Sequence, residues 1–554
     1  LKQFNGVDKS AHSFPVVKAQ CGILMVDLLT QMKAAGDNGV NALGYTFPNT
    51  PGLTNVSLGG VLAIGGHGTS IGVASQPVMQ SGYGCMSSHV VEFTAICYDD
   101  TTKKYAVKKF VRGQANGEDS AFICALGRTI LVEASLRCEV NFNVRCRSYV
   151  DKHSSVLFAA PTDAIPVPPN SCQDFLARTG RLEVIYFPYL DEKNDYPWLH
   201  TWEVCDTKPA ESTEITKPDN YPFTTNVPAF VTTMYNLILG YPSDRGQLHA
   251  EITEFLGPLG GSEALTQVVT LLNLCLTFIN NKVLDTRRLT KLLMRVQQGI
   301  AASNLKKPEL NDLWGPSHCS LLYITSHTIR ATANGYAVAM KVKDVQRGIN
   351  FFTTTVKAIL ADMETQNLFP VNTGMEIRVT GLDKADSTGL SGAKAPFLTS
   401  TAMDDQAQAN GWDCVLWLDV LSVPTSMGLN TFYSRLEEKL TQFVFFQPPH
   451  GLLRPEYSKG WAYTERGPHT NYDFLDSTRR NLPHFVDART VFEKYDPKGI
   501  FGSAFLQEFF NRYTLPQYDS ASGKAARKRE VQVQCSKYVW EDQVDPQLPN
   551  GGAW

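Results

Sequence analysis

The chain has 554 residues, of which 43% are hydrophobic and 19% are charged, with 41 glycines and 30 prolines. This balance is typical of a folded globular protein, and the length predicts more than one domain because single cores rarely grow past roughly 250–300 residues. The net charge of −3 provides no basic field for nucleic acid, and none of the 12 cysteines forms a C-x-x-C pair. We therefore expect neither a nucleic-acid partner nor a metal site.

The sequence also lacks the marks of a membrane-spanning or targeting segment. The longest apolar run, residues 266–279, is too short and too polar to span a bilayer, so we expect no transmembrane span. The opening residues "LKQFNGVDKS" have neither a Met start nor a targeting pattern. The basic residues within 523–530 are interpreted as part of a solvated C-terminal tail.

The first 150 residues are predicted to mix helices and strands. Residues 14–36 have the pattern of a strand, a turn and an amphipathic helix. Residues 89–100 alternate as a strand does and are expected to form a hairpin with the strand that follows, and residues 129–140 form another strand. A glycine loop at residues 58–72 is expected between these elements.

From about residue 149 a second mixture of helices and strands is predicted, after a Pro-rich connection at residues 159–171. Helical segments dominate residues 227–302, and further helices are predicted at residues 344–366 and 427–443. Strands are predicted at residues 181–190, 198–208, 320–330, 375–383 and 413–423. This order indicates an α+β fold in which a sheet is backed by helices on one side.

The stretch "LGGVLAIGGHGTSIG", residues 58–72, places His67 among glycines. It is not a dinucleotide-binding motif, because no βαβ unit with a following acidic residue surrounds it, and no Lys-Ser/Thr pair makes it a Walker A loop. No G-x-S-x-G nucleophile accompanies His67. The stretch therefore predicts either a backbone cradle for a flat or phosphorylated ligand with the imidazole aimed at it, or a tight turn with a solvent-facing histidine.

The order of this glycine stretch, a strand, a hairpin and a final strand resembles the flavin-binding domain of the vanillyl-alcohol-oxidase-type FAD-linked oxidases. Within that family the chain is most similar to the covalent-flavin (type II) bacterial cholesterol oxidases. This similarity rests on the segments "NFNVRCRSYVD", "WEVCDTKP", "MEIRVTGLD", "VLWLDVLSVP", "RPEYSKGWAY" and "YDPKGIFGSAF". The resemblance runs from about residue 15 to about residue 510 and so includes most of the chain.

The resemblance implies FAD as the cofactor. His67 falls on the histidine whose ring nitrogen is bonded to the flavin 8α carbon in that subfamily, a bond that raises the flavin potential and prevents loss of the cofactor. A side chain next to His67 would hold the imidazole away from the flavin, so its glycine neighbours are expected to lie against the cofactor. The expected cofactor-binding residues are His67, Gly59, Gly60, Gly65, Gly66, Gly68 and Thr69.

Glu376 and Arg378 of "MEIR" fall on the carboxylate–guanidinium pair of the active-site cavity in that family. Residues i and i+2 of a strand share one face, so both side chains can point into one pocket. Ile377 and Val379 are apolar and are expected to face the opposite, packed side. Arg378 is expected to shape the pocket and to gate oxygen entry. The alternative is an exposed ion pair on a strand, worth about 0–1 kcal/mol.

Asp419, in "WLDVL", departs from the family pattern, which has an asparagine there. Near Glu376 its carboxylate would form a like-charge pair that raises at least one pKa, and either residue is expected to be the catalytic base. Lys459, in "YSKGWAY", is expected to stabilise negative charge on the reduced flavin, the alternative being a surface lysine in a turn. The family also implies a second, gating carboxylate, for which the candidates are Glu203, Glu214 and Glu251.

The resemblance implies an oxidase for a hydrophobic alcohol such as a 3β-hydroxysteroid. The carbinol hydrogen leaves as hydride to flavin N5, the hydroxyl proton passes to the base, and O₂ is reduced to H₂O₂. With a sterol, Glu376 could also move a proton to isomerise the double bond. The competing hypothesis is a flavin-fold protein without turnover that serves as a binding or structural subunit. The resemblance favours a secreted or lumenal location.

These inferences divide the chain into four parts. We expect the second part of an FAD-binding domain at residues 1–150, an α+β substrate-binding cap at 151–486, a return segment to the FAD domain at 487–515 and an irregular tail at 516–554. The first FAD subdomain, which holds the pyrophosphate, is expected to be missing. Because a sheet cut there exposes a strand edge, we also expect a second polypeptide that supplies this subdomain.

Overall fold

The protein is described from a computed structural model. The structure describes residues 2–9, 12–36, 42–114, 116–189, 192–218, 233, 245–256, 289–305, 307–321, 331–424, 426–482 and 484–510. Contacts divide the chain into two units, residues 1–502 and residues 503–554, and each is described by itself. The described part of the second unit contains helix α17 (Ala504–Phe509), and the predicted irregular tail lies outside the described residues.

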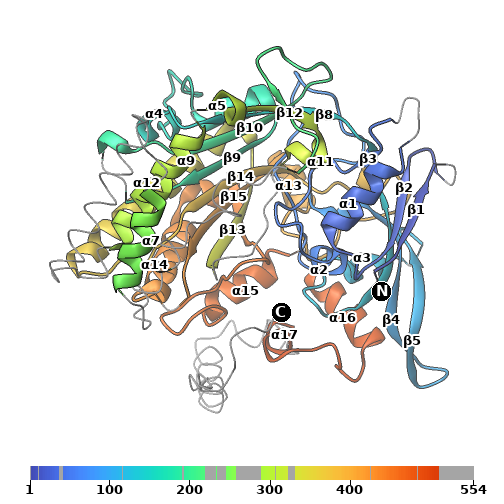
Figure 1. Cartoon of the computed structure of the whole chain (residues 1–554). Coiled ribbons are helices and arrows are strands. Elements are labelled where there is room, and N and C mark those ends of the chain that lie inside the picture. Colours follow the sequence, from blue (N-terminus) through green and yellow to red (C-terminus); the bar gives the residue numbers. More distant parts are fainter. Residues whose placement is uncertain are drawn as a thin grey trace, which may run out of the picture. The chain divides into compact units, whose positions relative to one another are not determined.

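A five-stranded antiparallel sheet lies in the N-terminal part of the first unit, with the strand order β1-β2-β6-β4-β5 (Figure 1). The predicted hairpin is present as β4 and β5, which pair from Glu92 opposite Val111 to Asp99 opposite Lys104. The predicted amphipathic helix is α1 (Met25–Ala34), whose apolar side chains are buried. The strands are β1 (Phe4–Asp8), β2 (Val16–Gln20), β4 (Val90–Asp99), β5 (Lys104–Val111) and β6 (Leu131–Arg137).

A nine-stranded sheet forms the centre of the first unit, with the order β11-β12-β8-β10-β9-β14-β15-β13-β16 (Figure 1). β15, with the sequence CVLWLDVLS, is almost entirely apolar, whereas β14, with the sequence MEIRVTG, alternates polar and apolar side chains between its two faces. The strands are β8 (Asn143–Tyr149), β9 (Leu182–Tyr186), β10 (Trp198–Val204), β11 (Thr213–Glu214), β12 (Asp312–Pro316), β13 (Thr332–Met340), β14 (Met375–Gly381), β15 (Cys414–Ser422) and β16 (Gly451–Pro455).

Helices cover one face of this sheet, as predicted. α12 and α14 lie along it (Figure 1) and contact one another. α12 approaches β15 at Gly348, where an added Cβ would lie 2.6 Å from Cδ2 of Leu416. The face towards α12 carries Ile377 and Val379, which are fully buried as predicted. The helices packed around this sheet are α5 (Cys172–Thr179), α9 (Leu289–Leu305), α12 (Val345–Thr365) and α14 (Leu429–Gln442).

The remaining described elements connect the two sheets or continue the chain around them. The short strands β3 (Tyr45–Thr46) and β7 (Glu139–Val140) pair with each other. The remaining helices are α3 (Asp119–Phe122), α4 (Ser154–Leu157), α7 (Arg245–Leu256), α10 (Pro308–Asn311), α11 (Ser317–Ser320), α13 (Asp405–Asn410), α15 (Tyr472–Arg480) and α16 (Phe485–Tyr495). No helix among the described residues is both long and apolar enough to cross a membrane.

The first part of the glycine stretch is a helix, where we predicted a loop. α2 (Leu58–Ala63) contains Gly59 and Gly60. Ser57 caps its N-terminus by accepting a hydrogen bond from the Gly60 amide at 3.2 Å, and Leu58, Val61 and Leu62 are buried. Burial of this apolar face and the Ser57 cap override the low helix propensity of two glycines.

Two strand predictions have other outcomes. β13 was not predicted, although it pairs with β15 on one side and with the edge strand β16 on the other. The strand expected at 320–330 begins in α11, and residues 322–330 lie outside the described residues. The helical region expected at 227–302 is described in part, as α7 and most of α9. The predicted four-part domain division stays a prediction.

Candidate active site

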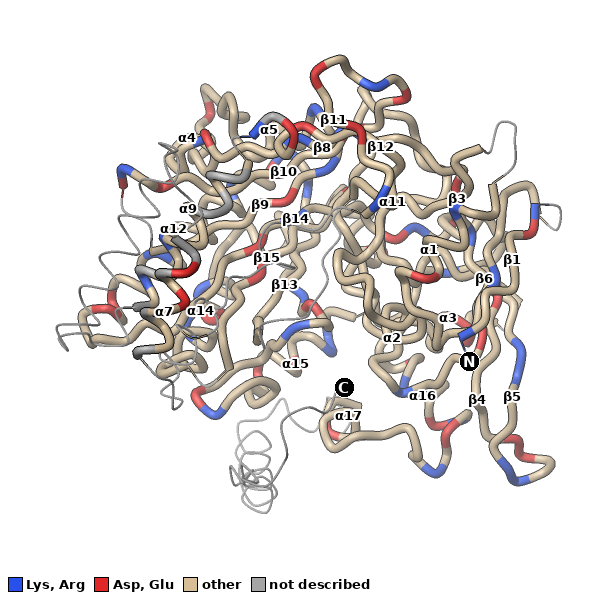
Figure 2. The backbone as a smooth tube through the Cα atoms, in the orientation of Figure 1, with Lys and Arg blue, Asp and Glu red and all other residues tan. Residues whose placement is uncertain are grey.

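Strand register brings three of the predicted site residues together. β14 and β15 are antiparallel, with Glu376 opposite Asp419 and Arg378 opposite Trp417. All four side chains therefore share the sheet face that α12 does not cover. On the other side of β14, Glu183 of β9 is opposite Arg378. Acidic positions thus occur on all three central strands β9, β14 and β15 (Figure 2).

The guanidinium of Arg378 lies at the centre of these side chains. Its Nε is 3.1 Å from Oε1 of Glu376, and its Nη2 donates to Oδ2 of Asp419 at 2.9 Å. The same Nη2 is 3.8 Å from Oε1 of Glu456. Arg378 and its partners are almost completely removed from water, so these charges interact in a medium of low dielectric.

Glu456 and Lys459 come from the turn that follows β16. The Glu456 amide donates to Gly335 of β13 at 3.0 Å, which fixes the start of the turn. Nζ of Lys459 lies 3.4 Å from Oε1 of Glu456 and 3.6 Å from Oδ2 of Asp419. A Cβ on Gly335 would lie 2.4 Å from Oδ1 of Asp419 and 2.6 Å from Cγ of Lys459, so this contact requires a glycine. We call Glu183, Glu376, Arg378, Asp419, Glu456 and Lys459 the Arg378 cluster.

Main-chain pairing brings His67 to the same place. The Ser70 amide donates to Val379 of β14 at 2.9 Å, and the Gly381 amide donates to Ser70 at 2.9 Å. The hydroxyl of Thr69 donates to the carbonyl of Leu182 at 2.6 Å and lies 3.1 Å from the carbonyl of Val379. Thr69 thus ties the His67 segment to β9 and β14, and its predicted role in cofactor binding stays a prediction.

The His67 ring is buried against the Arg378 cluster. It stacks on Trp417 with ring centroids 3.5 Å apart and an interplanar angle of 13°. Nε2 lies 3.6 Å from Oε1 of Glu456, and Nδ1 lies 3.1 Å from the carbonyl oxygen of Gly68. Burial lowers the pKa of His67, although Glu456 opposes this effect. A neutral imidazole has one N–H, so one ring nitrogen keeps a lone pair for another bond.

The glycines around His67 allow close packing of the chain against itself. Gly65 has φ +63°, a Cβ on Gly66 would lie 2.7 Å from Cγ1 of Val61, and a Cβ on Gly68 would lie 2.4 Å from the carbonyl oxygen of Thr50. In α2, the amides of Gly59 and Gly60 donate to the carbonyl of Cys21 and the hydroxyl of Ser57. Their predicted contacts with a cofactor stay predictions.

The carboxyl groups of the Arg378 cluster divide into two kinds. Burial alone would raise the pKa of Glu376, but Arg378 and Lys459 lower it below its usual range. Burial would likewise raise the pKa of Glu456, which Lys459, His67 and Arg378 hold well below its usual range. These two carboxyl groups are therefore ionised at neutral pH.

Asp419 and Glu183 have the opposite shift. Burial and the negative charge of Glu456 raise the pKa of Asp419 well above its usual range. Burial, the negative charge of Glu376 and a hydrogen bond with the Glu376 carboxylate raise the pKa of Glu183 in the same way. Both are therefore neutral acids, each with a proton to donate. Two ionised carboxylates then balance the cations Arg378 and Lys459.

The sequence identified Glu376, Arg378, Asp419 and Lys459, but not Glu183, Glu456 or Trp417. Two signals were available. Glu183 is a charged residue within the otherwise apolar strand "LEVIY", and Glu456 precedes Lys459 by three residues in "RPEYSKGWAY". Trp417 and Asp419 are two apart on one strand, which places them on one face. These patterns are not specific enough without the pairing of strands.

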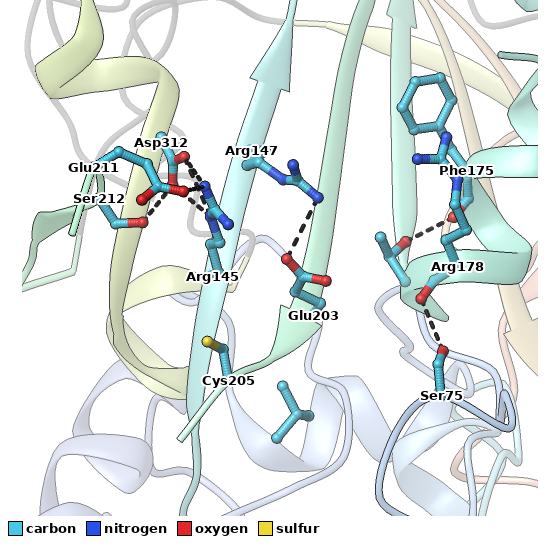
Figure 3. A network of polar contacts seen from close by, with 12 residues as sticks. Ser75, Arg145, Arg147, Phe175, Arg178, Glu203, Cys205, Glu211, Ser212 and Asp312 are labelled. Carbon is cyan, nitrogen blue, oxygen red and sulfur yellow. Dashed lines mark hydrogen bonds and ion pairs between the residues drawn. The ribbon is translucent and has the colours of Figure 1, made fainter. Parts of the chain in front are cut away.

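The three candidates for a gating carboxylate lie on other elements, and two of them have other side-chain partners. Glu203 of β10 pairs with Arg147 of β8 at 3.4 Å (Figure 3). Glu251 accepts hydrogen bonds from Thr233 at 2.7 Å and from Gln247 at 2.9 Å. Glu214 lies on the edge strand β11. Among the described contacts, none of the three reaches the Arg378 cluster, and the identity of a gating residue stays open.

The residues of this site fit the redox-active ring of FAD. Arg378 and Lys459 are cations of the kind that stabilises a ring that becomes negative on reduction. Oδ1 of Asp419 and Oε2 of Glu456 are buried and have no hydrogen-bond partner among the described residues, so each can accept or share another hydrogen bond. His67 offers the ring nitrogen that a covalent flavin requires. The Arg378 cluster and His67 thus place together, in one buried region, two cations, two oxygens that can form a further hydrogen bond and one imidazole.

Comparison with known proteins agrees with this geometry. A family model described as "Cholesterol oxidase, substrate-binding" matches residues 143–253 and 267–511. A solved structure titled "Solvent-stable cholesterol oxidase" is 30% identical, with a TM-score of 0.76, 92% of this chain covered and 84% of that chain. A cholesterol oxidase from B. sterolicum has 24% identity, a TM-score of 0.75 and coverage of 92% and 83%, and shows the fold. No curated protein sequence matches the chain.

These comparisons also bear on the predicted partner chain. Each of the two solved structures is covered over more than four fifths of its own length. The comparisons do not support the predicted second polypeptide, and they do not confirm that the first FAD subdomain is missing. They likewise do not favour the hypothesis of a non-catalytic subunit, because the relatives are oxidases by name.

Proposed function

The chain belongs to the family described as cholesterol oxidase, substrate-binding, and we propose that it oxidises a large hydrophobic alcohol of the 3β-hydroxysteroid type. As a member of this family it is an FAD-dependent oxidoreductase that acts on CH–OH groups with O₂ as acceptor. The proposed substrate class rests on the names of these relatives. The observation that supports the site is the buried Arg378 cluster beside His67.

The cofactor side of the proposal assigns three residues. Bound FAD supplies the acceptor for the carbinol hydrogen and the path of its electrons to O₂, which becomes H₂O₂. Lys459 and Arg378 would stabilise negative charge on the cofactor. Burial alone would lower the pKa of both cations, but the neighbouring carboxyl groups raise it and keep them charged. His67 would hold the cofactor through one of its two ring nitrogens, which lie near the carbonyl oxygen of Gly68 and near Oε1 of Glu456.

Glu376 is the proposed base for the hydroxyl proton. A base must be ionised at the working pH, and Arg378 with Lys459 gives Glu376 that state against the effect of burial. The Nε of Arg378, 3.1 Å from Oε1, orients the carboxylate. Asp419 was the other candidate from the sequence, but its raised pKa makes it an acid rather than a base at neutral pH. We therefore assign Asp419 the role of a neutral hydrogen-bond donor.

The substrate class is tested with the purified protein. We expect a yellow protein that produces H₂O₂ with 3β-hydroxysteroids and not with short water-soluble alcohols. Steroids with a 3α-hydroxyl group serve as the matched control. They differ from the 3β-hydroxysteroids only in the configuration at C3, where the hydroxyl group and the carbinol hydrogen exchange places. A colourless protein would support the non-catalytic hypothesis, and equal rates with short alcohols would contradict the substrate class.

The bond between His67 and flavin is tested on denatured protein. If His67 is bonded to FAD, a fluorescent band remains after denaturing electrophoresis of the wild type and is lost in His67→Ala. His153→Ala is the matched control, because His153 is a half-buried histidine that caps α4 and forms none of the described contacts with the Arg378 cluster. Loss of fluorescence from the wild type on denaturation would contradict a covalent bond and would leave the oxidase proposal to the substrate test.

A further inference from the structure

Glu437 is a buried carboxylate on α14 that lies outside the Arg378 cluster. Its Oε2 accepts hydrogen bonds from the hydroxyl of Tyr336 at 2.9 Å and from the amides of Ala462 and Tyr463 at 2.7 Å and 3.3 Å. Its Oε1 accepts from Nδ2 of Asn471 at 2.8 Å. The side chain is fully buried, and no Lys or Arg of the described residues forms an ion pair with it. Every contact made by this carboxylate is thus with a donor.

These donors lie at both ends of the turn that carries Glu456 and Lys459. On β13, Tyr336 is opposite Pro455, the residue immediately before Glu456. At the other end, Ala462 has φ +56°, a left-handed conformation that costs free energy for a residue with a side chain. Three hydrogen bonds hold that strained residue in place. Its own amide donates to Glu437, and its carbonyl accepts from the amides of Thr470 at 2.8 Å and Asn471 at 2.9 Å.

We propose that Glu437 is a positioning residue whose carboxylate holds residues 456–463 so that Glu456 and Lys459 keep their contacts with Arg378, Asp419 and His67. This inference rests on the proposed function of the Arg378 cluster. Glu437 itself does not touch those residues. It acts through the backbone of the turn, because it joins β13, the strained residue Ala462 and the N-terminus of α15 to α14.

The stability of the turn at residues 456–463 is expected to depend on pH through Glu437. Burial raises the pKa of Glu437 to about 7, although hydrogen bonds from Tyr336, Asn471 and the turn amides oppose it. The titratable groups packed around it are Tyr336 on β13, Tyr433 on α14 and Tyr463 on the turn, and burial raises the pKa of each, so all stay neutral. Because the closed turn raises the pKa of Glu437, it binds the proton more tightly than the opened turn does, and ionisation of Glu437 favours opening. The turn is therefore held less firmly as pH rises through about 7.

The test uses amide hydrogen exchange and kinetics on the flavin-loaded protein. In the wild type, protection of the Ala462 and Tyr463 amides, corrected for intrinsic rates, should fall about tenfold between about pH 6 and about pH 8. In Glu437→Gln that fall should be absent. Glu438→Gln is the matched control, since Glu438 is the next residue of α14 and is exposed. If the Gln variant does not fold, the wild-type profile still decides, because a flat profile overturns the inference.

A double-mutant cycle with Lys459→Met tests whether Glu437 acts through the turn. We expect Glu437→Gln alone to lower kcat/KM about tenfold at about pH 8, and to cause no further loss in the Lys459→Met background. Additive losses would overturn the inference. If Lys459→Met leaves kcat/KM unchanged, the proposed function of the cluster fails, whatever the exchange data show. If Lys459→Met is impaired but Glu437→Gln behaves as Glu438→Gln does, only the positioning role of Glu437 fails.

Discussion

Two ion-pair networks on the nine-stranded sheet differ in burial and in the balance of charge. Towards the β11 end of the sheet, Arg145 of β8 binds Asp312 of β12 and Glu211, with Nη2 2.6 Å from Oε1 of Glu211 (Figure 3). Glu211 is 62% exposed, so water shares in its solvation. The Arg378 cluster lies on the central strands and is buried, and it holds four carboxyl groups against two cations.

The acids of these two networks titrate differently. The pKa of Glu211 is lowered by its own backbone hydrogen bond and by Arg145, and Arg145 with Ser212 lowers that of Asp312 although burial alone would raise it. Both pKa shifts are downward, as expected for carboxylates in a structural ion pair. In the Arg378 cluster two acids shift down and two shift up. Acid–base catalysis needs neighbouring acids whose pKa values are shifted in opposite directions. The comparison therefore indicates that the Arg378 cluster is a functional site and that the Arg145 network is structural.

The largest expected effect is on turnover in Glu376→Gln. The amide removes the proposed base, so kcat should fall by roughly 10²–10⁴-fold while the flavin content is unchanged. Steady-state formation of H₂O₂ measures it. Glu211→Gln removes a carboxylate from the outer network instead and should leave kcat as in the wild type. Equal rates for the wild type and Glu376→Gln would show that the Arg378 cluster is a structural ion-pair network, like that of Arg145.

The next effect concerns stability in the two arginine variants. Arg378→Met leaves buried carboxylates without their cation and should lower the free energy of unfolding by about 3–5 kcal/mol. Arg145→Met should cost roughly 1 kcal/mol, because water can solvate its exposed partner. Urea unfolding curves of both variants make the comparison. If Arg145→Met loses as much free energy of unfolding as Arg378→Met, the two networks do not differ in stability as their burial predicts.

A smaller effect is expected from Gly335→Ala on β13. The new Cβ would lie 2.4 Å from Oδ1 of Asp419 and 2.6 Å from Cγ of Lys459, so both side chains must move. Overpacking of this kind costs about 1–3 kcal/mol and should also reduce kcat. Gly374→Ala, at the residue that precedes β14, is the control, because the atoms nearest to its Cβ, Cγ2 of Ile185 and the carbonyl oxygen of Tyr186, would be 3.4 Å away. Wild-type kcat in Gly335→Ala would mean that the Lys459–Asp419 contact is dispensable.

The smallest effect is expected from Asp419→Asn. An amide replaces a neutral acid, so kcat/KM near neutral pH should stay within about tenfold of the wild type. The pH dependence should change instead. The wild type loses its neutral Asp419, and with it activity and stability, as pH rises towards the raised pKa of this group, whereas the amide cannot titrate. A kcat/KM profile that keeps the same alkaline limb in Asp419→Asn would show that another group causes it.

The sequence predicted the parts of the fold that depend on local patterns. β14 and β15 were expected as strands, and the alternation along "MEIRV" correctly placed Ile377 and Val379 on the face opposite Glu376. The hairpin of β4 and β5 follows from two alternating segments joined by a short turn. These signals are carried by a few neighbouring residues, so they need no knowledge of tertiary contacts.

The residues that the sequence missed depend on contacts between distant segments. Glu183 belongs to the site because β9 pairs with β14, and Glu456 because its turn packs over Gly335 of β13, a strand that was not predicted. The helix α2 formed where glycines predicted a loop, because burial of its apolar face outweighs propensity. The direction of the pKa shift of Asp419 could not be assigned from sequence, since it is set by burial and then by the negative charge of Glu456, which belongs to a distant segment.

The most direct test of the central claim is a single-turnover experiment without oxygen. The flavin-loaded protein is mixed anaerobically with a 3β-hydroxysteroid, and the loss of flavin absorbance is followed in the wild type, Glu376→Gln and Glu211→Gln. If the Arg378 cluster is the active site of an alcohol oxidase, the wild type and Glu211→Gln bleach at the same rate and Glu376→Gln bleaches roughly 10²–10⁴-fold more slowly. No bleaching of the wild type, or equal rates for all three proteins, would contradict the account.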